Sequence, residues 1–512
     1  MNVIVRQILT FVRKNKSLTA ILLLMWFIPR IFSAGSILTA DESTWIERST
    51  NFMRAISKLE LKNTRQFRIA EASHPGVTLM WAGGTGVILE RATSSFFNYS
   101  SETRLFLIKL PLIIIGGMLF LLIFFGLTKI VDKRVAFFTS SFLALDPFFL
   151  GYSRLLHLDA MLSMFMFASI IFFLLALNQK DHINYYLKIS AVLGGLAFLT
   201  KVPAFAIIPI IPLILIFITK FNKQRIIYSF RLFLRWIAIS AVTFVILWPA
   251  MWVTPKESLQ SLFGAARIGL TEAHNISEYI LDPYYYVNTF KNFSSPIVMF
   301  LVLSSVIFLK KKKLLETKSL LISLFFIIYF IVGMTLGAKK GLRYILPIYP
   351  HLFFLSGLGL NGILNAIKNK RIALLVALIA MIIIIFQTVN IHPYYLAYYN
   401  PLVEPPVKMG FGEGIELAAK YLETKEKPED LIVSSWYPDV MATYFPGTIL
   451  GLDSIDKADY VVLYRGMKGR AEIDPATRII NSYETMIPDK TIYLNNLEYV
   501  WIYEGGRNIK SK

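Results

Sequence analysis

The feature that most constrains the fold is a series of apolar segments, each long enough or nearly long enough to cross a lipid bilayer. A helix needs about 20 predominantly apolar residues to span the hydrocarbon core. With 55% hydrophobic and only 17% charged residues, the chain belongs among integral membrane proteins rather than soluble domains. We therefore expect an α-helical polytopic membrane protein. The sequence predicts about eleven transmembrane helices, over 18–38, 104–128, 134–150, 158–177, 185–200, 203–219, 229–250, 295–309, 319–337, 343–364 and 372–390.

Pro203 interrupts the long apolar stretch 185–219 and marks either a kink in one helix or a turn between two spans. The distribution of charge favours the turn. With a cytoplasmic N-terminus and a turn at Pro203, most lysines and arginines of the short loops lie inside, including the run Lys310 to Lys313. A single kinked span would place that run outside, although cytoplasmic loops normally carry the positive charge.

Three longer segments then face the outer side of the cell membrane: 39–103, 251–294 and a tail from about 391. The first of them predicts two interfacial helices, one with Trp45 and Phe52 on a face and one that begins after Pro75.

The tail differs from the rest of the chain because its apolar runs are short and separated by Pro, Gly and Asp. It predicts a helix over 413–423 and strands over 431–436, 460–464 and 499–503. We expect residues 1–390 to form the transmembrane domain and residues 391–512 to form a small extracytoplasmic α/β domain. The N-terminus of the chain is expected on the opposite, cytoplasmic side.

The net charge of +20 does not indicate a nucleic-acid partner. Basic residues in cytoplasmic loops account for most of it, and no basic stripe accompanies a recognisable recognition motif. The absence of cysteine excludes a disulfide framework and cysteine-based catalysis.

Asp41 and Glu42 follow the first apolar segment by only a few residues, where nothing apolar requires two acids. The pattern Thr44-Trp45-Ile46-Glu47 matches a capping box, so we expect a helix to begin directly after the two acids. Their carboxylates would then lie at the membrane surface, where one of them can accept a proton from a hydroxyl that arrives from water. Asp41 and Glu42 are therefore the candidate catalytic residues.

Other charged groups on the same predicted side have structural as well as functional interpretations. Arg154 and Asp159 could form a structural ion pair at an outer loop, Lys201 could reach the interface along its aliphatic stem, and a lone Arg343 at a span start would be unremarkable. Together, however, Arg154, Lys201 and Arg343 with Tyr344 would suit a phosphate leaving group. A site with both an acid and these cations predicts group transfer from a phosphate-linked donor.

Histidines on the outer side raise the question of a metal. His74 with Glu71, and His274, lie in outer loops, but no HxxxH or HExxH spacing is present. We therefore predict neither a metal nor another cofactor. Glu71, His74, His157, Asp159 and His274 are expected to contact substrate or to hold their loops.

The chain resembles the GT-C membrane glycosyltransferases, specifically glycosyltransferase family 39, which includes protein O-mannosyltransferases and is close to the aminoarabinose transferase of lipid A. The resemblance covers roughly residues 1–390. It is carried by Ala40-Asp41-Glu42, His74-Pro75-Gly76, the stretch from Ser153-Arg154 to Asp159, Leu199-Thr200-Lys201-Val202-Pro203 and Gly341-Leu342-Arg343-Tyr344-Ile345-Leu346-Pro347. Two departures are the single proline after His74 and Val202 in place of a frequent glycine.

The resemblance implies an inverting glycosyltransferase that uses a polyprenyl-phosphate sugar on the extracytoplasmic side. It implies that Asp41 activates the acceptor, with Glu42 beside it, and that Arg154, Lys201 and Arg343 hold the lipid phosphate. The acceptor would be a protein, a lipid or a glycan.

Two other classes of protein are compatible with such a sequence. A transporter or flippase of a lipid-linked or anionic solute would place its charges near the membrane midplane, in two related halves of the chain. A non-catalytic membrane scaffold would leave Asp41 and Glu42 without a role. Neutralising either acid would then be harmless.

Overall fold

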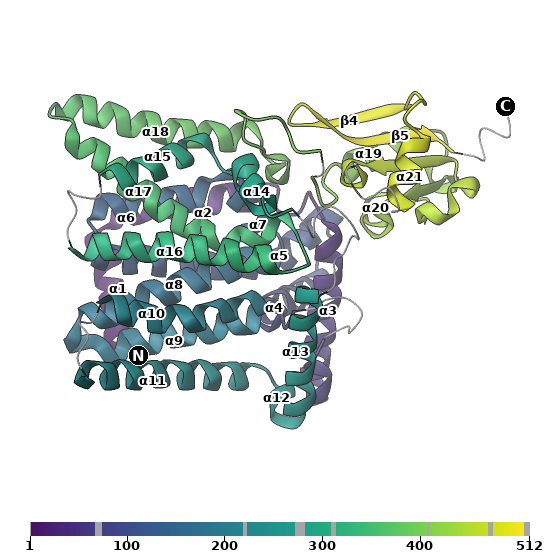
Figure 1. Ribbon diagram of the computed structural model, residues 1–512. Coiled ribbons are helices and arrows are strands. Elements are labelled where there is room, and N and C mark those ends of the chain that lie inside the picture. The colour runs from purple at the N-terminus through teal and green to yellow at the C-terminus, as the bar shows by residue number, and fades with distance from the viewer. Residues whose placement is uncertain are drawn as a thin grey trace.

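The computed structural model describes residues 2–66, 74–218, 223–271, 282–308, 314–407, 409–468, 470 and 475–505. A bundle of long helices lies beside a small sheet domain formed by the tail (Figure 1). The bundle consists of α1 (Asn2–Lys14), α2 (Lys16–Ile31), α5 (Ser101–Ile130), α6 (Lys133–Leu145), α7 (Pro147–Ser153), α8 (Leu158–Asn178), α9 (Ile183–Thr200), α10 (Ile207–Ile218), α11 (Lys223–Leu247), α15 (Pro296–Ile307), α16 (Leu314–Leu336), α17 (Tyr349–Ala366) and α18 (Lys370–Asn390).

Among the described residues, six helices are long and apolar enough to cross a membrane, or up to eight if each of two bent pairs is one span. The other predicted spans fall on shorter or less apolar helices, including α2 and α10, so the number eleven stays a prediction. The predicted span 134–150 is two helices, α6 and α7, bent by 64°. The bend lies at Asp146, because the following Pro147 disfavours helical geometry in the residue before it.

The predicted turn at Pro203 is present. The backbone of Lys201 is extended after α9, a short 3-10 helix η3 (Val202–Ala206) follows, and α10 then runs back along the bundle (Figure 1). Lys201 therefore lies at an end of the bundle, in the turn between two helices.

The helices of the outer segments gather across one end of the bundle, the end that faces the sheet domain (Figure 1). They are α3 (Ala40–Ser57), α4 (Val77–Ser94), α12 (Ala250–Val253), α13 (Pro255–Thr271) and α14 (Tyr285–Phe293). The two helices predicted in the first loop are confirmed as α3 and α4.

Gly76 allows α4 to begin close to α3. It has φ +62°, and a Cβ atom at this position would lie 2.2 Å from the ring of Trp45. Its N–H donates a hydrogen bond of 3.1 Å to the carbonyl of Thr200 at the end of α9. This contact brings His74, two residues earlier, next to Lys201.

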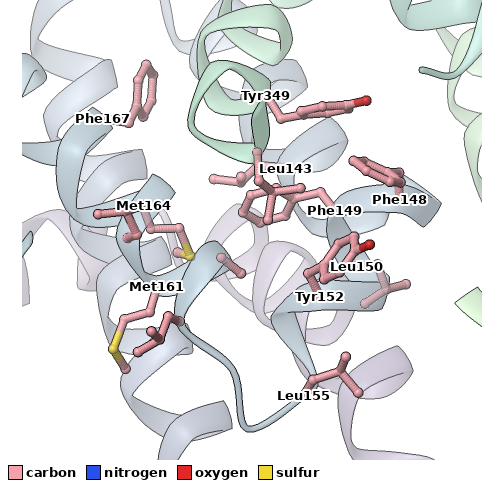
Figure 2. Packing of buried hydrophobic residues seen from close by; sticks show 14 of the residues in the cluster. Leu143, Phe148, Phe149, Leu150, Tyr152, Leu155, Met161, Met164, Phe167 and Tyr349 are labelled. Atoms are coloured by element: carbon pink, nitrogen blue, oxygen red, sulfur yellow. The ribbon is translucent and has the colours of Figure 1, made fainter. Parts of the chain in front are cut away.

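The interior of the bundle is tightly packed around α8. Of the most apolar stretch of α8, 94% of the residues are buried inside the bundle. A helix that is enclosed on all sides needs apolar residues on every face, as α8 has. Aromatic rings of α7 pack against α14 and α17, with ring centroids of Phe148 5.1 Å from Phe293 and 5.0 Å from Tyr349. Figure 2 shows Phe148 beside Tyr349, with other apolar side chains around the turn from α7 to α8. That turn is therefore supported by a rigid apolar layer.

The tail forms a five-stranded mixed sheet with strand order β2-β1-β3-β5-β4. β2 and β3 are parallel to β1, and β5 is antiparallel to both β3 and β4. The predicted helix and three strands correspond to α19, β1, β3 and β5, whereas the short β2 and β4 were not predicted. The helices and strands of the tail are α19 (Ile415–Leu422), β1 (Ile432–Ser435), α20 (Pro438–Tyr444), β2 (Thr448–Leu450), β3 (Tyr460–Tyr464), α21 (Pro475–Ser482), β4 (Lys490–Leu494) and β5 (Leu497–Glu504).

The tail is tied directly to the start of α3. The N–H of Ala40 donates to the carbonyl of Phe411 at 3.0 Å, and the hydroxyl of Tyr444 donates to the carbonyl of Ser36 at 3.2 Å. The sheet domain thus lies against the segment that carries Asp41.

Candidate active site

The helix that carries the acidic pair begins earlier than the Thr44 pattern predicts. α3 starts at Ala40, and its capping box is formed by Thr39 and Glu42. Thr39-Ala40-Asp41-Glu42 has the same spacing as the pattern at Thr44, and it caps a helix whose first turn carries both acids. Negative charge is favourable there because of the helix dipole. Asp41 and Glu42 are therefore in the helix rather than before it.

Glu42 is fully buried and its carboxylate is occupied by structural partners. One oxygen accepts from the N–H of Leu156 at 2.7 Å and pairs with Lys109 Nζ at 2.9 Å. The other accepts from the N–H of Thr39 at 2.9 Å. These contacts join α3, α5 and the turn before α8.

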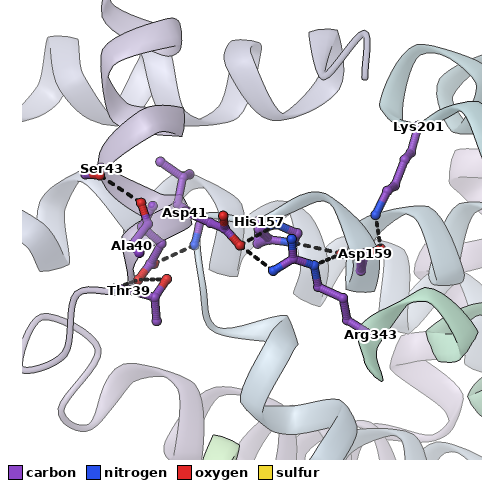
Figure 3. Close-up of polar contacts among 10 residues, drawn as sticks. Thr39, Ala40, Asp41, Ser43, His157, Asp159, Lys201 and Arg343 are labelled. Carbon is purple, nitrogen blue, oxygen red and sulfur yellow. Dashed lines mark hydrogen bonds and ion pairs between the residues drawn. The ribbon is translucent and has the colours of Figure 1, made fainter. Parts of the chain in front are cut away.

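Asp41 lies instead in a cluster of charged side chains from four parts of the chain (Figure 3). Arg343, from the 3-10 helix η5 (Leu342–Ile348), donates a hydrogen bond to Asp41 Oδ2, and its Nε is 3.5 Å from Asp159 Oδ2. Asp159, near the start of α8, also accepts from Lys201 Nζ at 2.6 Å. His157 bridges the two acids, with Nδ1 2.9 Å from Asp159 Oδ2 and Nε2 3.6 Å from Asp41 Oδ2.

The members of this cluster differ in exposure. The side chains of Asp159, Lys201 and His157 are buried, whereas that of Asp41 is 40% exposed. Asp41 is therefore the carboxylate of the cluster that a molecule in solution can reach.

The charges around Asp41 keep it ionised. Burial by itself raises the pKa of Asp41, but Arg343 and His157 outweigh this effect and hold the pKa below the ordinary aspartate value. Asp41 is consequently a carboxylate at neutral pH.

His74 lies beside the cluster in a neutral form. Enclosure by the protein, reinforced by the positive charge of Lys201, holds the pKa of His74 well below that of an ordinary histidine. Its Nδ1 is buried and has no hydrogen-bond partner among the described side chains and backbone. A neutral imidazole with an unused nitrogen suits a contact with a bound molecule.

Two cavities meet at Tyr344. The first, here the outer cavity, has a volume of about 610 Å³ and lies between α14, η5 and the tail, with Tyr285, Arg343, Phe411 and Tyr437 in its wall. The second, here the apolar cavity, has a volume of about 390 Å³ and lies between η3, α13 and α16. Tyr344 lines both, and its ring centroid is 4.5 Å from Lys201 Nζ.

Arg154 does not join the cluster. Its guanidinium donates to the carbonyls of Ser33 and, at 3.1 Å, Pro393, and it lies 5.3 Å from the ring centroid of Tyr395. It does not pair with Asp159 either. Arg154 links the end of α7 to the segment after α2 and to the start of the tail, and a role in binding phosphate stays a prediction.

Glu71 and His274 lie outside the described residues. Within the part of the chain that the structure describes, no group of three or more His, Asp and Glu side chains is arranged to hold a metal ion. A reaction without a metal stays a prediction.

Two buried cations that sequence reasoning missed hold the site in place. Lys109 pairs with Glu42 and donates to the carbonyl of Ile37 at 2.7 Å. Arg30 donates to Ser153 Oγ at 3.0 Å and to two backbone carbonyls. Both interrupt predicted apolar spans, and ionisable residues at such positions are usually functional or paired. That signal could have identified them.

Comparison with solved structures identifies the fold. ArnT from Cupriavidus metallidurans bound to undecaprenyl phosphate aligns over 96% of this chain and 98% of its own, with 14% identity and a TM-score of 0.51. The Archaeoglobus fulgidus oligosaccharyltransferase in the apo form aligns over 88% of this chain and 69% of its own, also with 14% identity and a TM-score of 0.51. The chain thus has the fold of the GT-C membrane glycosyltransferases.

A family model points to the same class. The model described as dolichyl-phosphate-mannose-protein mannosyltransferase matches residues 94–249, which is under a third of the chain. A search of curated proteins finds no match. The fold and the family match both agree with the resemblance noted in the sequence, a likeness to GT-C membrane glycosyltransferases and to protein mannosyltransferases.

Proposed function

We propose that the enzyme transfers a sugar, with inversion, from a polyprenyl-phosphate donor to a hydroxyl acceptor on the extracytoplasmic side of the membrane. The observation that carries this proposal is the position of one accessible carboxylate, Asp41. It contacts Arg343, which lines the outer cavity, and Arg343 in turn contacts Asp159, the partner of Lys201 in the wall of the apolar cavity.

The apolar cavity suits the donor. Three glycines line it, and at two of them, Gly269 and Gly333, the space around the Cα atom is open. An isoprenoid chain would fill this space, while its phosphate would lie toward Lys201 and His74 at the end of the cavity. The related ArnT structure contains undecaprenyl phosphate, which supports a lipid phosphate as the donor.

The outer cavity suits the acceptor. It contains Arg343 and is walled by aromatic rings of α14 and the tail. Aromatic faces with a few polar groups are a common lining for organic ligands. An acceptor in this cavity would approach the shared wall at Tyr344 from the side opposite the donor.

The reaction then follows from the positions of the charges. The acceptor oxygen attacks C1 of the sugar, the bond from C1 to the phosphate oxygen breaks, and its electron pair stays on the departing polyprenyl phosphate. The hydroxyl proton passes to Asp41 as the new bond forms, when the oxygen becomes acidic enough for a weak base. Lys201 and Arg343 stabilise the phosphate, and each well-placed contact is worth about 3 kcal/mol.

A transporter or flippase is less well supported. Such a protein would hold its key charges near the midplane. Asp41 instead lies at the start of α3, which crosses the end of the bundle that faces the sheet domain (Figure 1), and Asp159, Lys201 and Arg343 contact it directly or through one another.

The test is a turnover assay with the purified protein in lipid nanodiscs and a panel of polyprenyl-phosphate sugars. We expect at least one donor to release polyprenyl phosphate, and Asp41→Asn to lower the rate of this release at least about 100-fold. Lys370→Gln, at the exposed first residue of α18, is the control. Absence of release with every donor, or full activity of Asp41→Asn, would reject the proposed reaction.

A further inference from the structure

A third cavity lies at the other end of the bundle and has a different chemistry. Its volume is about 590 Å³, and it is formed by α1 together with the end of α5 and the start of α6. α1 lies at the end of the bundle remote from the sheet domain (Figure 1). The cavity is thus separated from the catalytic cluster by the length of the bundle.

The lining of this cavity is strongly basic. Arg6, Lys14, Lys129 and Lys133 contribute four positive charges, and no aspartate or glutamate is among the described residues that line it. Asp132 precedes Lys133 in the chain but is not part of the wall. Gln7, Thr10, Asn15 and Thr128 contribute uncharged hydrogen-bonding groups, and the ring of Phe11 completes the lining.

Contacts between α1 and the bundle hold the cavity in shape. The ring of Phe11 packs edge-on against Phe124 and Phe125 of α5, with centroids 5.5 and 5.6 Å away. Lys133 Nζ donates to Asn15 Oδ1 at 3.0 Å, which joins the start of α6 to the end of α1. The four cations therefore belong to a built concave site rather than to a disordered run of charge.

We propose that this cavity binds the phosphodiester headgroup of an anionic membrane phospholipid. Three observations support a lipid rather than a soluble phosphate compound. The cavity lies where α5, a helix long and apolar enough to cross a membrane, ends and α6 begins, and the end of such a helix is where headgroups are expected. Leu9 of α1 is 51% exposed beside it, as expected of an amphipathic helix in the interface. Basic pockets between helix ends are typical of anionic headgroup sites.

The basic cavity would make the protein bind anionic lipids in preference to neutral ones. The catalytic site at the other end of the bundle would not produce this preference. An anionic lipid would bridge α1 to α5 and α6, because its phosphate would contact cations of all three helices. Binding should weaken as salt increases, since the cations are exposed.

The experiment measures binding of short-chain phosphatidylglycerol to the purified full-length protein in a neutral detergent, with short-chain phosphatidylcholine as the zwitterionic comparison. We expect saturable binding of phosphatidylglycerol only. Lys129→Gln/Lys133→Gln should lower the affinity about 25-fold, because each cation near a headgroup is worth roughly fivefold. The matched control, Lys370→Gln/Arg371→Gln, removes two exposed charges at the start of α18, and should leave the affinity unchanged.

Three results would overturn the proposal: no preference for phosphatidylglycerol, equal weakening by both double variants, or full displacement of the lipid by equimolar inorganic phosphate. Equal weakening would assign the binding to diffuse charge. If the α5–α6 variant does not fold, Arg6→Gln/Lys14→Gln on α1 tests the same cavity with the same criteria.

Discussion

Asp41 and Glu42 are neighbours in the chain but have different surroundings. Successive residues of a helix point about 100° apart, so the first-turn position of the pair sends the two carboxylates in different directions. Asp41 contacts Arg343 and His157, whereas Glu42 contacts Lys109 and the backbone of Leu156. At the residue scale, the geometry therefore favours Asp41 as the base and gives Glu42 a structural set of partners.

We predict that Asp41→Asn lowers the rate of polyprenyl phosphate release roughly 100- to 10,000-fold, the range for loss of a general base. In the parent enzyme, the active form has ionised Asp41, and the neighbouring cations hold its pKa low. Activity is therefore lost only as pH falls through a value below the usual aspartate range. A pH–rate profile measures this limb. Asp456→Asn, an exposed acid of the tail, is the matched control; an acidic limb at neutral pH would contradict the assignment.

We predict that Glu42→Gln destabilises the protein by about 3 to 5 kcal/mol, because it leaves Lys109 buried without its carboxylate. The double variant Glu42→Gln/Lys109→Met removes both charges and should recover much of this loss. Thermal unfolding in detergent measures both variants. The folded double variant should keep a rate close to that of the parent. An inactive but well-folded double variant would instead assign Glu42 a catalytic role.

At the scale of elements, α19 illustrates how the tail buries polar groups against the bundle. Glu416, in its first turn, is buried and accepts hydrogen bonds from the hydroxyl of Tyr394 at 2.7 Å and from the N–H of Gly414 at 2.9 Å. Burial, assisted by nearby Glu413, nevertheless raises the pKa of Glu416 to about 7. Tyr394 lies at the start of the tail, four residues after the end of α18, so this contact holds α19 close to the last helix of the bundle.

We predict that the tail is more stable in mild acid than at alkaline pH. In the folded protein the pKa of Glu416 is about 7, against 4.5 for an ordinary glutamate. The stabilisation of the tail by protonated Glu416 is therefore fully present below pH 4.5. It is lost as pH rises through 7, a change of about 3 kcal/mol. Hydrogen exchange of β3 and β5 in the full chain measures the effect. Glu416→Gln should flatten the dependence, and an unchanged dependence in this variant would contradict it.

At the scale of the whole molecule, segments far apart in the sequence meet at one end of the bundle. Asp41 follows α2, Asp159 begins α8, Lys201 ends α9, and Arg343 lies before α17. The tail closes over the same end through its contacts with Ala40 and Ser36. If the charge pattern of the loops sets the orientation, this end faces outward and the basic cavity faces the cytoplasm.

We predict that Lys457→Cys in the tail reacts with a membrane-impermeant thiol reagent added to intact cells, whereas Lys370→Cys reacts only after permeabilisation. Both positions are exposed, and the absence of native cysteine removes background labelling. The parent protein is the unlabelled control. Labelling of Lys370→Cys alone in intact cells would reverse the proposed orientation.

Local patterns were sufficient for the helical membrane class, the turn at Pro203, α3 and α4, and three strands of the tail. Most of these depend on the periodicity or chemistry of contiguous residues, which the chain order displays directly. The turn at Pro203 also needed the distribution of charge over the other loops. The same patterns misplaced the start of α3, because two capping boxes with the same spacing compete and only packing selects between Thr39 and Thr44.

The composition of the active site was decided by tertiary packing. The sequence assigned Asp41 as an acid and Arg154, Lys201 and Arg343 as cations to one site, but the folded bundle brings only Asp41, Lys201 and Arg343 together. It directs Arg154 to backbone carbonyls. It also pairs Glu42 with Lys109 across 67 residues of sequence. Side-chain direction depends on how helices pack, and that packing is set by long-range contacts that no local stretch of residues contains.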